Sequence, residues 1–147
     1  MKNYFNEKNL HSIDSKGRIL LPKEIRAHFE IKKGDVLHMI PNLSGSAYLE
    51  LRTAPLWRRY RESLRRQDPG EKKKDTFRYA EMLQETGTVD GQGRILIPQG
   101  IRDVCQLGQT VAVVNMDVYI EIWSKEQMEQ KYADMVRAFK ELNDRMF

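Results

Sequence analysis

A thirteen-residue segment occurs twice in this chain, at residues 14–26 and again at residues 90–102. The two copies read DSKGRILLPKEIR and DGQGRILIPQGIR, and they agree at eight of thirteen positions under a constant offset of 76. An internal repeat constrains the architecture before any other feature, because each copy is expected to form the same supersecondary unit. The chain is therefore predicted to consist of two related halves.

Each copy begins with the residue pattern of a tight β-turn. Asp at the first position and Gly at the fourth favour a type I turn, in which the carboxylate accepts backbone N–H bonds and glycine supplies a positive φ. Asp14–Gly17 and Asp90–Gly93 are thus predicted to be the tips of β-hairpins. The branched apolar residues after each turn predict strands, and period-two alternation places Ile19 and Leu21 on one face and Arg18 and Leu20 on the other.

A short helix is predicted after each of these strands. Pro22 suits a first helical turn, because the N–H that proline lacks would be unpaired there. Ile25 and Phe29 lie four residues apart and would share one side of the helix. Gly34–Asp35 is predicted to end the helix and to lead into another strand.

The later strands of each half repeat as well. YLEL at residues 48–51 matches YIEI at residues 119–122 at an offset of 71. Each half is therefore predicted as β-turn-β-α-β-β followed by a helix, which makes the fold class α+β and mainly β. We expect one cooperative unit with four parts: a first half at residues 8–53, a basic helical connector at 54–81, a second half at 82–124 and a C-terminal helix at 125–147.

Longer helices are predicted outside the two halves. Thr53 and Pro55 favour a helix start, and apolar side chains follow at helical spacing among many arginines, which suit either a solvated face or a phosphate contact. A charged connector is predicted at residues 71–75, before one more short helix. Ser124 opens a capping-box pattern at the start of the C-terminal helix. The apolar stripe of that helix favours packing, in part between subunits, and comprises Met128, Tyr132, Met135, Phe139 and Leu142.

The composition of the chain indicates its cellular compartment and the charge of its binding partner. In 147 residues no apolar run approaches the roughly 20 residues that span a bilayer, so no membrane partner is predicted. Cys105 is the only cysteine, which excludes an intrachain disulfide and fits a reducing cytosol. The net charge is +4, and residues 52–78 hold 10 Lys/Arg against 4 Asp/Glu. This basic segment favours an anionic partner.

The residues that would carry catalysis or hold a metal lack the spacing that such sites need. His11, His28 and His38 have no metal-type spacing to one another or to Cys105. The Gly-x-Gly at residues 91–93 lacks the third glycine of a dinucleotide loop, and a strand follows it where that loop needs a helix. The sequence predicts no enzyme, no metal, no cofactor and no small-molecule substrate.

Arg18 and Arg94 follow the two turn glycines, and neither the turn nor the core requires arginine there. One interpretation is an ion pair across the turn, for example between Arg18 and Asp14, which would make the tip rigid. The other is a guanidinium held on a rigid hairpin, which suits bidentate bonds to phosphate or to a guanine edge. Both interpretations stay open, and the two arginines could divide the roles.

Two Asp-x-x-Gly-Arg hairpins in one chain, each followed by a helix that begins at proline, resemble the MraZ family over nearly the whole chain. Each half is similar to the swapped-hairpin domain of AbrB and MazE proteins. The resemblance implies a double-split (swapped-hairpin) β-barrel of two pseudo-symmetric halves with flanking helices. It also implies a cytoplasmic, nucleoid-associated DNA-binding transcriptional regulator that acts on the bacterial cell-division and cell-wall gene cluster, binds short direct repeats and assembles into a ring-shaped homo-oligomer.

By this resemblance, double-stranded DNA is expected to contact Lys16, Arg18 and Arg94, and the positive charge of Lys23 adds it to the expected DNA-binding residues. The turn residues of the motif are Asp14, Gly17, Asp90 and Gly93. The second copy carries Gln92 and Gln99 where the first has Lys16 and Lys23, so the first tip is expected to attract anions better. The second hairpin is left with two possible roles, in DNA contact or in folding and assembly.

Two other functions fit the same residues. A ring-forming scaffold would use the arginines for subunit contacts and would bind no DNA specifically. A MazE-type antitoxin would carry one copy of the motif and a disordered tail that binds its partner. Here the motif occurs twice and the tail is a patterned helix, which weakens the antitoxin interpretation.

Overall fold

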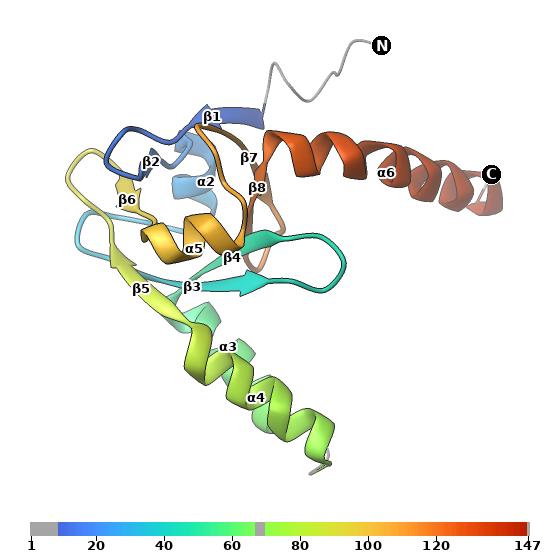
Figure 1. The fold of residues 1–147 in the computed structure, drawn as a ribbon, viewed down its shortest axis with the longest axis horizontal. Coiled ribbons are helices and arrows are strands. Elements are labelled where there is room, and N and C mark those ends of the chain that lie inside the picture. Colours follow the sequence, from blue (N-terminus) through green and yellow to red (C-terminus); the bar gives the residue numbers. More distant parts are fainter. Residues whose placement is uncertain (1–8, 67–69, 147) are drawn as a thin grey trace.

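The computed structural model describes residues 9–66 and 70–146, and it has a mixed α+β fold centred on antiparallel β-sheet (Figure 1). The strands are β1 (Leu10–Ser12), β2 (Arg18–Leu20), β3 (Val36–Asn42), β4 (Tyr48–Thr53), β5 (Glu85–Thr88), β6 (Arg94–Leu96), β7 (Thr110–Asn115) and β8 (Ile120–Ser124). The helices are α2 (Lys23–His28), α3 (Ala54–Arg65), α4 (Glu71–Leu83), α5 (Gln99–Val104) and α6 (Lys125–Met146). Each half therefore has the predicted order of elements.

The two repeats are interleaved through their strands. Six strands form one antiparallel sheet in the order β1-β7-β8-β4-β3-β5, so that β1 of the first repeat pairs with β7 of the second, and β5 of the second pairs with β3 of the first. The hairpin strands β2 and β6 form a separate two-stranded ribbon. A single bridge between Ile13 and Ile19 links β1 to β2. Closure of these sheets into a barrel stays a prediction.

Side-chain alternation along the ribbon divides it into a core face and an outer face. Ile19 and Ile95 lie opposite each other across β2 and β6, and both are buried in one cluster with residues of the large sheet. Leu20 and Leu96 point the other way and are 51% and 50% exposed. The predicted alternation is confirmed, and Ile19 lies on the core face. Burying an isoleucine stabilises the fold by about 1.5–3 kcal/mol relative to leaving it in water.

The first short helix ends earlier than the sequence indicated. α2 ends at His28 and not at Gly34–Asp35, because the backbone turns left-handed at Glu30, with φ 53°. This conformation allows the Ile31 N–H to donate to the Arg26 carbonyl at 2.8 Å, which closes the end of the helix. Glycine is the usual residue at such a position, so the local sequence carried no signal for it.

α3 and α4 form a helical hairpin that extends from the large sheet (Figure 1). α3 starts after Thr53 as predicted, although no side-chain bond caps it. α4 begins at Glu71, so residues 71–75 belong to a helix and are not the predicted connector. Ion pairs from Arg78 to Glu71 and Asp75 lie along this helix and support its first turns. The hairpin packs on the sheet through Ile40, Trp57 and Ala80.

α6 begins where the capping pattern predicts and then leaves the sheet. The Gln127 N–H donates to Ser124 Oγ at 3.0 Å. Met128 is buried against Ala112 and Trp123, which attaches the first turns to the sheet. Beyond this point the helix runs away from the strands (Figure 1). The exposed part of its apolar stripe comprises Met135, Phe139 and Leu142.

A buried polar network covers the face of the large sheet opposite the core. Glu50 on β4 and Glu121 on β8 lie directly opposite each other, and both are buried. Arg52 Nη1 donates to Glu50 at 2.8 Å, and Glu121 accepts bonds from the Tyr119 hydroxyl and from Trp123 Nε1. A satisfied buried network of this kind favours one strand register over its alternatives.

Candidate nucleic-acid interface

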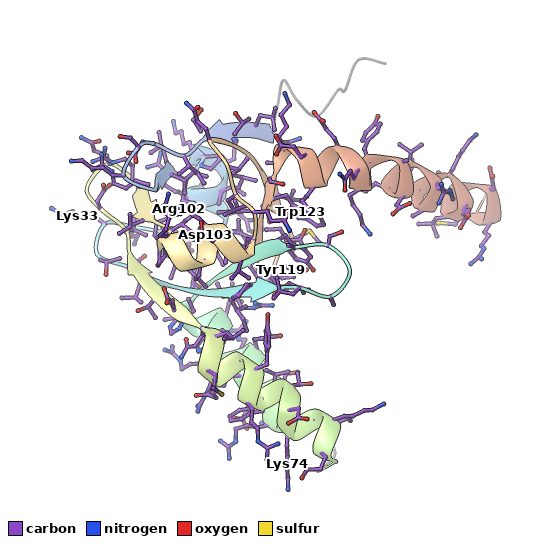
Figure 2. All side chains as sticks on the ribbon, in the orientation of Figure 1. Lys33, Lys74, Arg102, Asp103, Tyr119 and Trp123 are labelled. Carbon is purple, nitrogen blue, oxygen red and sulfur yellow. The ribbon has the colours of Figure 1, made fainter. Side chains whose placement is uncertain are left out.

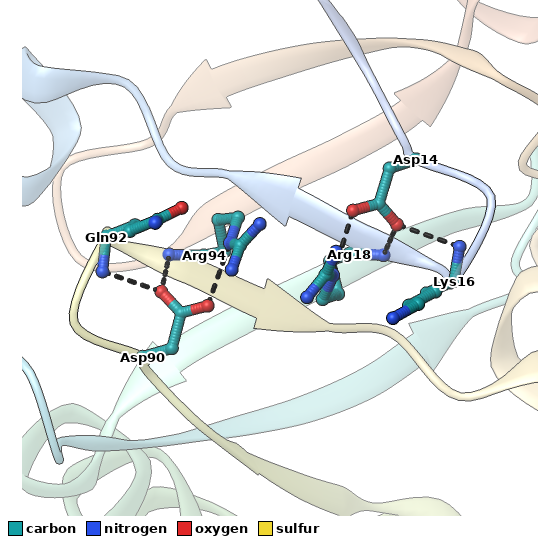
Figure 3. A network of polar contacts seen from close by, with 6 residues as sticks. All are labelled: Asp14, Lys16, Arg18, Asp90, Gln92 and Arg94. Atoms are coloured by element: carbon teal, nitrogen blue, oxygen red, sulfur yellow. Dashed lines mark hydrogen bonds and ion pairs between the residues drawn. The ribbon is translucent and has the colours of Figure 1, made fainter.

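The first turn is organised by the carboxylate of Asp14 (Figure 3). Its Oδ1 accepts the backbone N–H groups of Lys16 and Arg18, both at 2.9 Å, and its Oδ2 accepts the Nε–H of Arg18 at 2.8 Å. The Gly17 N–H donates to the Asp14 carbonyl at 2.9 Å, and Gly17 has the positive φ, 87°, that the turn requires. One short side chain thus fixes both the backbone of the tip and the direction of the arginine.

The second turn repeats this arrangement bond for bond (Figure 3). Asp90 accepts the N–H groups of Gln92 and Arg94 at 2.9 Å each, and the Nε–H of Arg94 at 2.8 Å. The Gly93 N–H donates to the Asp90 carbonyl at 3.0 Å, and Gly93 has a φ of 85°. Both turns therefore have the geometry that the repeated motif predicts.

Hydrogen bonds to the two carboxylates favour their charged forms. The backbone N–H of Arg18, and then its guanidinium, hold the pKa of Asp14 below its usual value. The backbone N–H of Arg94, followed by the bonds from Gln92 and the Arg94 guanidinium, lower the pKa of Asp90 to about 2. Both carboxylates are consequently ionised at neutral pH, where they keep the turns closed.

The ion pair that was one interpretation of the arginines is present in both repeats. It engages only Nε, so Nη1 and Nη2 of Arg18 and Arg94 make no hydrogen bond to any residue that the structure describes. The two side chains remain 31% and 29% exposed. Each guanidinium is therefore held at one edge and keeps two nitrogens for an external acceptor, so the ion pair does not exclude a binding role.

The antiparallel register of β2 and β6 places both arginines on the outer face of the ribbon. Arg18 lies opposite Leu96, and Leu20 lies opposite Arg94. The isoleucines between them face the core, so the outer face carries two arginines and two half-exposed leucines related by a pseudo-twofold axis. The ribbon is thus a narrow, exposed strip with a fixed guanidinium near each end.

Lys16 and Lys23 lie at opposite ends of this ribbon, which differs from the expectation that both flank Arg18. The Leu21 N–H donates to the Gly93 carbonyl at 3.1 Å, so β2 runs from the first turn toward the second. α2 starts at Lys23, directly after this bond, and therefore begins beside the second turn.

The basic groups are consequently shared between the two ends. The Ile97 N–H donates to the Gly17 carbonyl at 2.9 Å, so Gln99, at the start of α5, follows at the first turn. The second turn also has Lys33 nearby, because a side chain added at Gly91 would meet the methylenes of Lys33 (Figure 2). The expectation that the first tip attracts anions better counted Lys23 among the neighbours of Arg18, whereas Lys23 follows the strand end that lies beside the second turn.

Two further arginines, which the turn pattern did not single out, complete the turns. Arg26 and Arg102 each donate from Nε to the carbonyl at the end of their own hairpin strand, at 3.0 and 2.9 Å. Arg102 lies against Gly17, and Arg26 lies against Gly93, so each contacts the turn of the other repeat. These arginines could have been found from the sequence, because the last position of both copies of the repeat is arginine although the helix itself does not need arginine there.

Acidic neighbours pair with some of the arginines of α3 and its C-terminal end, but among the described residues Arg58 and Arg59 form no ion pair. Arg61 pairs with Glu81 of α4. Glu62 lies 3.6 Å from Arg65 and 3.4 Å from Arg66. Exposed pairs of this kind contribute little to stability, and both interpretations of the arginines of α3, a solvated face and a phosphate contact, stay open.

His28, His38 and Cys105 have structural environments. His28 Nε2 lies 3.0 Å from the Asp117 carbonyl, and His38 Nδ1 lies 3.0 Å from Gln84 Oε1. Burial raises the pKa of the Cys105 thiol to about 12, which disfavours the reactive thiolate. Within residues 9–66 and 70–146, no group of three or more His, Cys, Asp or Glu is arranged to hold a metal ion. Among the helices of this part of the chain, none combines the length and the apolar character needed to cross a membrane.

Comparison with known proteins gives one consistent family. The model of the MraZ family, described as an antitoxin-like MraZ protein, matches residues 4–79 and 83–147. The Transcriptional regulator MraZ of Finegoldia magna is 33% identical, over 95% of this chain and 94% of that protein. The protein of the same name from Lachnoclostridium phytofermentans is 32% identical over 84% of each chain. With a family match that takes in both turns and nearly all of the sequence, this chain belongs to the MraZ family.

Proposed function

We propose that this chain is a sequence-specific transcriptional regulator that binds double-stranded DNA through its two Asp-x-x-Gly-Arg turns. The observation that carries the proposal is the β2–β6 ribbon, on which Arg18 and Arg94 share one outer face while aspartate fixes their Nε groups. Lys16 and Lys23 add positive charge at the two ends. The name of the relatives, Transcriptional regulator MraZ, supports the same conclusion.

The ribbon suits DNA for geometric and energetic reasons. The major groove admits a two-stranded antiparallel ribbon, and guanine presents two acceptors there that one arginine can bond together. A phosphate accepts the same bidentate arrangement. Because the Nε bonds orient each guanidinium before DNA arrives, less side-chain entropy is lost on binding than for a free surface arginine.

The MraZ resemblance supplies the biological setting of the proposal. The protein acts in the cytoplasm, in association with the nucleoid. It recognises short direct repeats at the cell-division and cell-wall gene cluster. Neither a cofactor nor catalysis has a part in this function.

The proposal includes self-association into a ring. It is supported by the apolar stripe of α6, where Met135, Phe139 and Leu142 are exposed on a helix that has left the sheet. Contiguous apolar surface of this kind marks an interaction site. A ring would bring several ribbons together and so permit contact with successive repeats of one operator.

Within one subunit, we propose that residues 8–53 and 82–124 are the halves of a double-split β-barrel that unfolds as one cooperative unit. Residues 54–81 and 125–147 add the helices. The exchange of β1 and β5 between the repeats supports this, because a lone half would leave strand edges unpaired. A half produced alone is expected to be insoluble or to dimerise.

The test of DNA binding compares a duplex from upstream of the protein's own gene with a random duplex of equal length, at increasing salt. Neutralising Z phosphates predicts a slope of about −0.9Z in a plot of log Kobs against log salt. We expect tighter binding to the upstream duplex and a steep fall of affinity for both. Affinity that is constant from low to physiological salt would refute the proposal, and intact assembly in that case would favour a ring-forming scaffold.

A further inference from the structure

Arg26 and Arg102 each connect one repeat to the turn of the other. A Cβ atom at Gly17 would stand 2.7 Å from Nη2 and 2.8 Å from Cζ of Arg102, which belongs to α5 of the second repeat. A Cβ atom at Gly93 would stand 2.8 Å from Nη1 and 3.0 Å from Cζ of Arg26, which belongs to α2 of the first repeat. The open face of each turn glycine is therefore occupied by a guanidinium from the other half of the chain.

Each of these guanidinium groups is itself fixed. Arg102 Nε donates to the Ile97 carbonyl at 2.9 Å, and the N–H of the same Ile97 donates to the Gly17 carbonyl at 2.9 Å. Gly17 is thus held through its carbonyl and across its face by neighbouring groups of the second repeat. The equivalent bonds at the other turn measure 3.0 and 3.1 Å.

This contact explains why glycine and arginine occur together in both copies of the repeat. A side chain at the glycine would collide with the guanidinium, and the arginine cannot swing aside without losing its Nε bond. Within one copy, Arg26 lies far from its own turn, at the other end of the ribbon. Each glycine therefore contacts the arginine of the other copy of the repeat and not the arginine of its own copy.

We infer that Arg26 and Arg102 are positioning residues for DNA recognition, each fixing the orientation of the other repeat's turn. This inference rests on the proposed DNA-binding function. Recognition by a guanidinium needs placement within about 0.5 Å, and a turn closed only by its own aspartate is free to tilt as a unit. The contact is crossed, so Arg102 supports Arg18 of the first turn, and Arg26 supports Arg94 of the second.

The first experiment uses the free, full-length protein and no DNA. Amide hydrogen exchange is measured by NMR at Gly17 and Gly93, whose N–H groups close the two turns. Arg102→Ala should speed exchange at Gly17 about fivefold to tenfold and leave Gly93 unchanged, and Arg26→Ala should do the reverse. If a substitution speeds amide exchange equally at both turns, or changes it at neither turn, the crossed assignment is overturned whatever the protein binds.

The second experiment measures affinity for the upstream duplex in double-mutant cycles. Arg102→Ala should lower affinity about tenfold in the wild-type and Arg94→Ala backgrounds, but little in the Arg18→Ala background, where the supported contact is already lost. Equal losses in the two backgrounds would identify a merely structural residue and overturn the inference. Crossed exchange in a protein that binds no DNA at all would refute the proposed function and leave the positioning of the turns intact.

Salt dependence separates positioning from direct phosphate contact. The slope of log Kobs against log salt should be the same for Arg102→Ala and wild type, whereas a slope shallower by about 0.9 would show that Arg102 itself neutralises a phosphate and would overturn the inference. Arg102→Lys keeps the charge without the planar fork, so it should not restore affinity, and restoration would assign a charge role instead. Arg137→Ala, on exposed α6, controls for the loss of one arginine.

Discussion

Arg18 and Arg94 occupy equivalent places, and each has an aspartate at its Nε edge and two nitrogens available for an acceptor. We expect Arg18→Ala and Arg94→Ala each to lower operator affinity by about 1–3 kcal/mol, with weaker sequence preference wherever the guanidinium reads a base edge. Fluorescence anisotropy on operator and random duplexes measures both effects, and the elution volume of each variant in size exclusion controls for assembly. Undiminished operator affinity in one variant would exclude its turn from DNA contact.

Asp14 and Asp90 make the turns sensitive to acid. The pKa of Asp90 is about 2 in the folded protein, below its usual value of 3.8. The hydrogen bonds to this carboxylate therefore stabilise the fold fully at pH values above 3.8, and that stability is lost as the pH falls from 3.8 toward 2. The pKa of Asp14 is also lowered, which gives the same sign. Urea midpoints of Asp90→Asn should therefore depend less on pH than those of wild type between about pH 4 and pH 2. Parallel pH profiles of the two proteins would contradict this.

Considered as an element, each turn needs its glycine for two separable reasons. Gly17 combines a φ of 87° with the contact to Arg102, whereas Gly34 has a φ of 89° and open space around it. Gly34→Ala should therefore destabilise the fold by about 1–2 kcal/mol through backbone strain alone, and Gly17→Ala by more. Chemical denaturation measures both values, and Gly100→Ala, in open space on α5, is the control without strain. Equal losses at Gly17 and Gly34 would show that the guanidinium contact has no energetic weight.

On the scale of the whole molecule, β1 and β5 are paired within the chain, whereas much of α6 remains exposed. Strand exchange completes the sheet inside one chain, because β1 and β5 each find their partner in the other repeat. Among the described residues of α6, Met128 is the one buried side chain, whereas Met135, Phe139 and Leu142 of the apolar stripe are exposed. The exposed apolar stripe of α6 is therefore the surface that still needs to be covered, and we expect a second copy of the chain to cover it.

This assembly can be tested with one charge placed on or off the apolar stripe. Phe139 is 70% exposed within the stripe, and Ala133 is exposed on a different side of the same helix. Phe139→Glu should reduce the assembly to smaller species in analytical ultracentrifugation, since a charge inside an apolar interface is unpaired, and Ala133→Glu should not. A wild-type protein that is strictly monomeric at micromolar concentration would refute the ring.

The local sequence determined the two turns, the ribbon alternation and the start of α6. In each case the interaction joins residues close along the chain: Asp14 bonds residues two and four positions on, and Ser124 caps an N–H three positions on. Alternation of Ile19 and Leu20 follows in the same way from strand geometry. These features could be predicted because the free energy that selects them comes from a single turn of backbone.

Only the tertiary structure decided which groups meet at each turn. Lys23 lies beside the second turn and Arg102 on Gly17, although the sequence places Lys23 near the first turn and Arg102 far from it. The extent of α4 and the early end of α2 were also missed. The physical reason is that the antiparallel pairing of β2 with β6 is selected by burying both isoleucine faces in one core. That free energy is a sum over contacts between distant segments, and no single window of the sequence contains it.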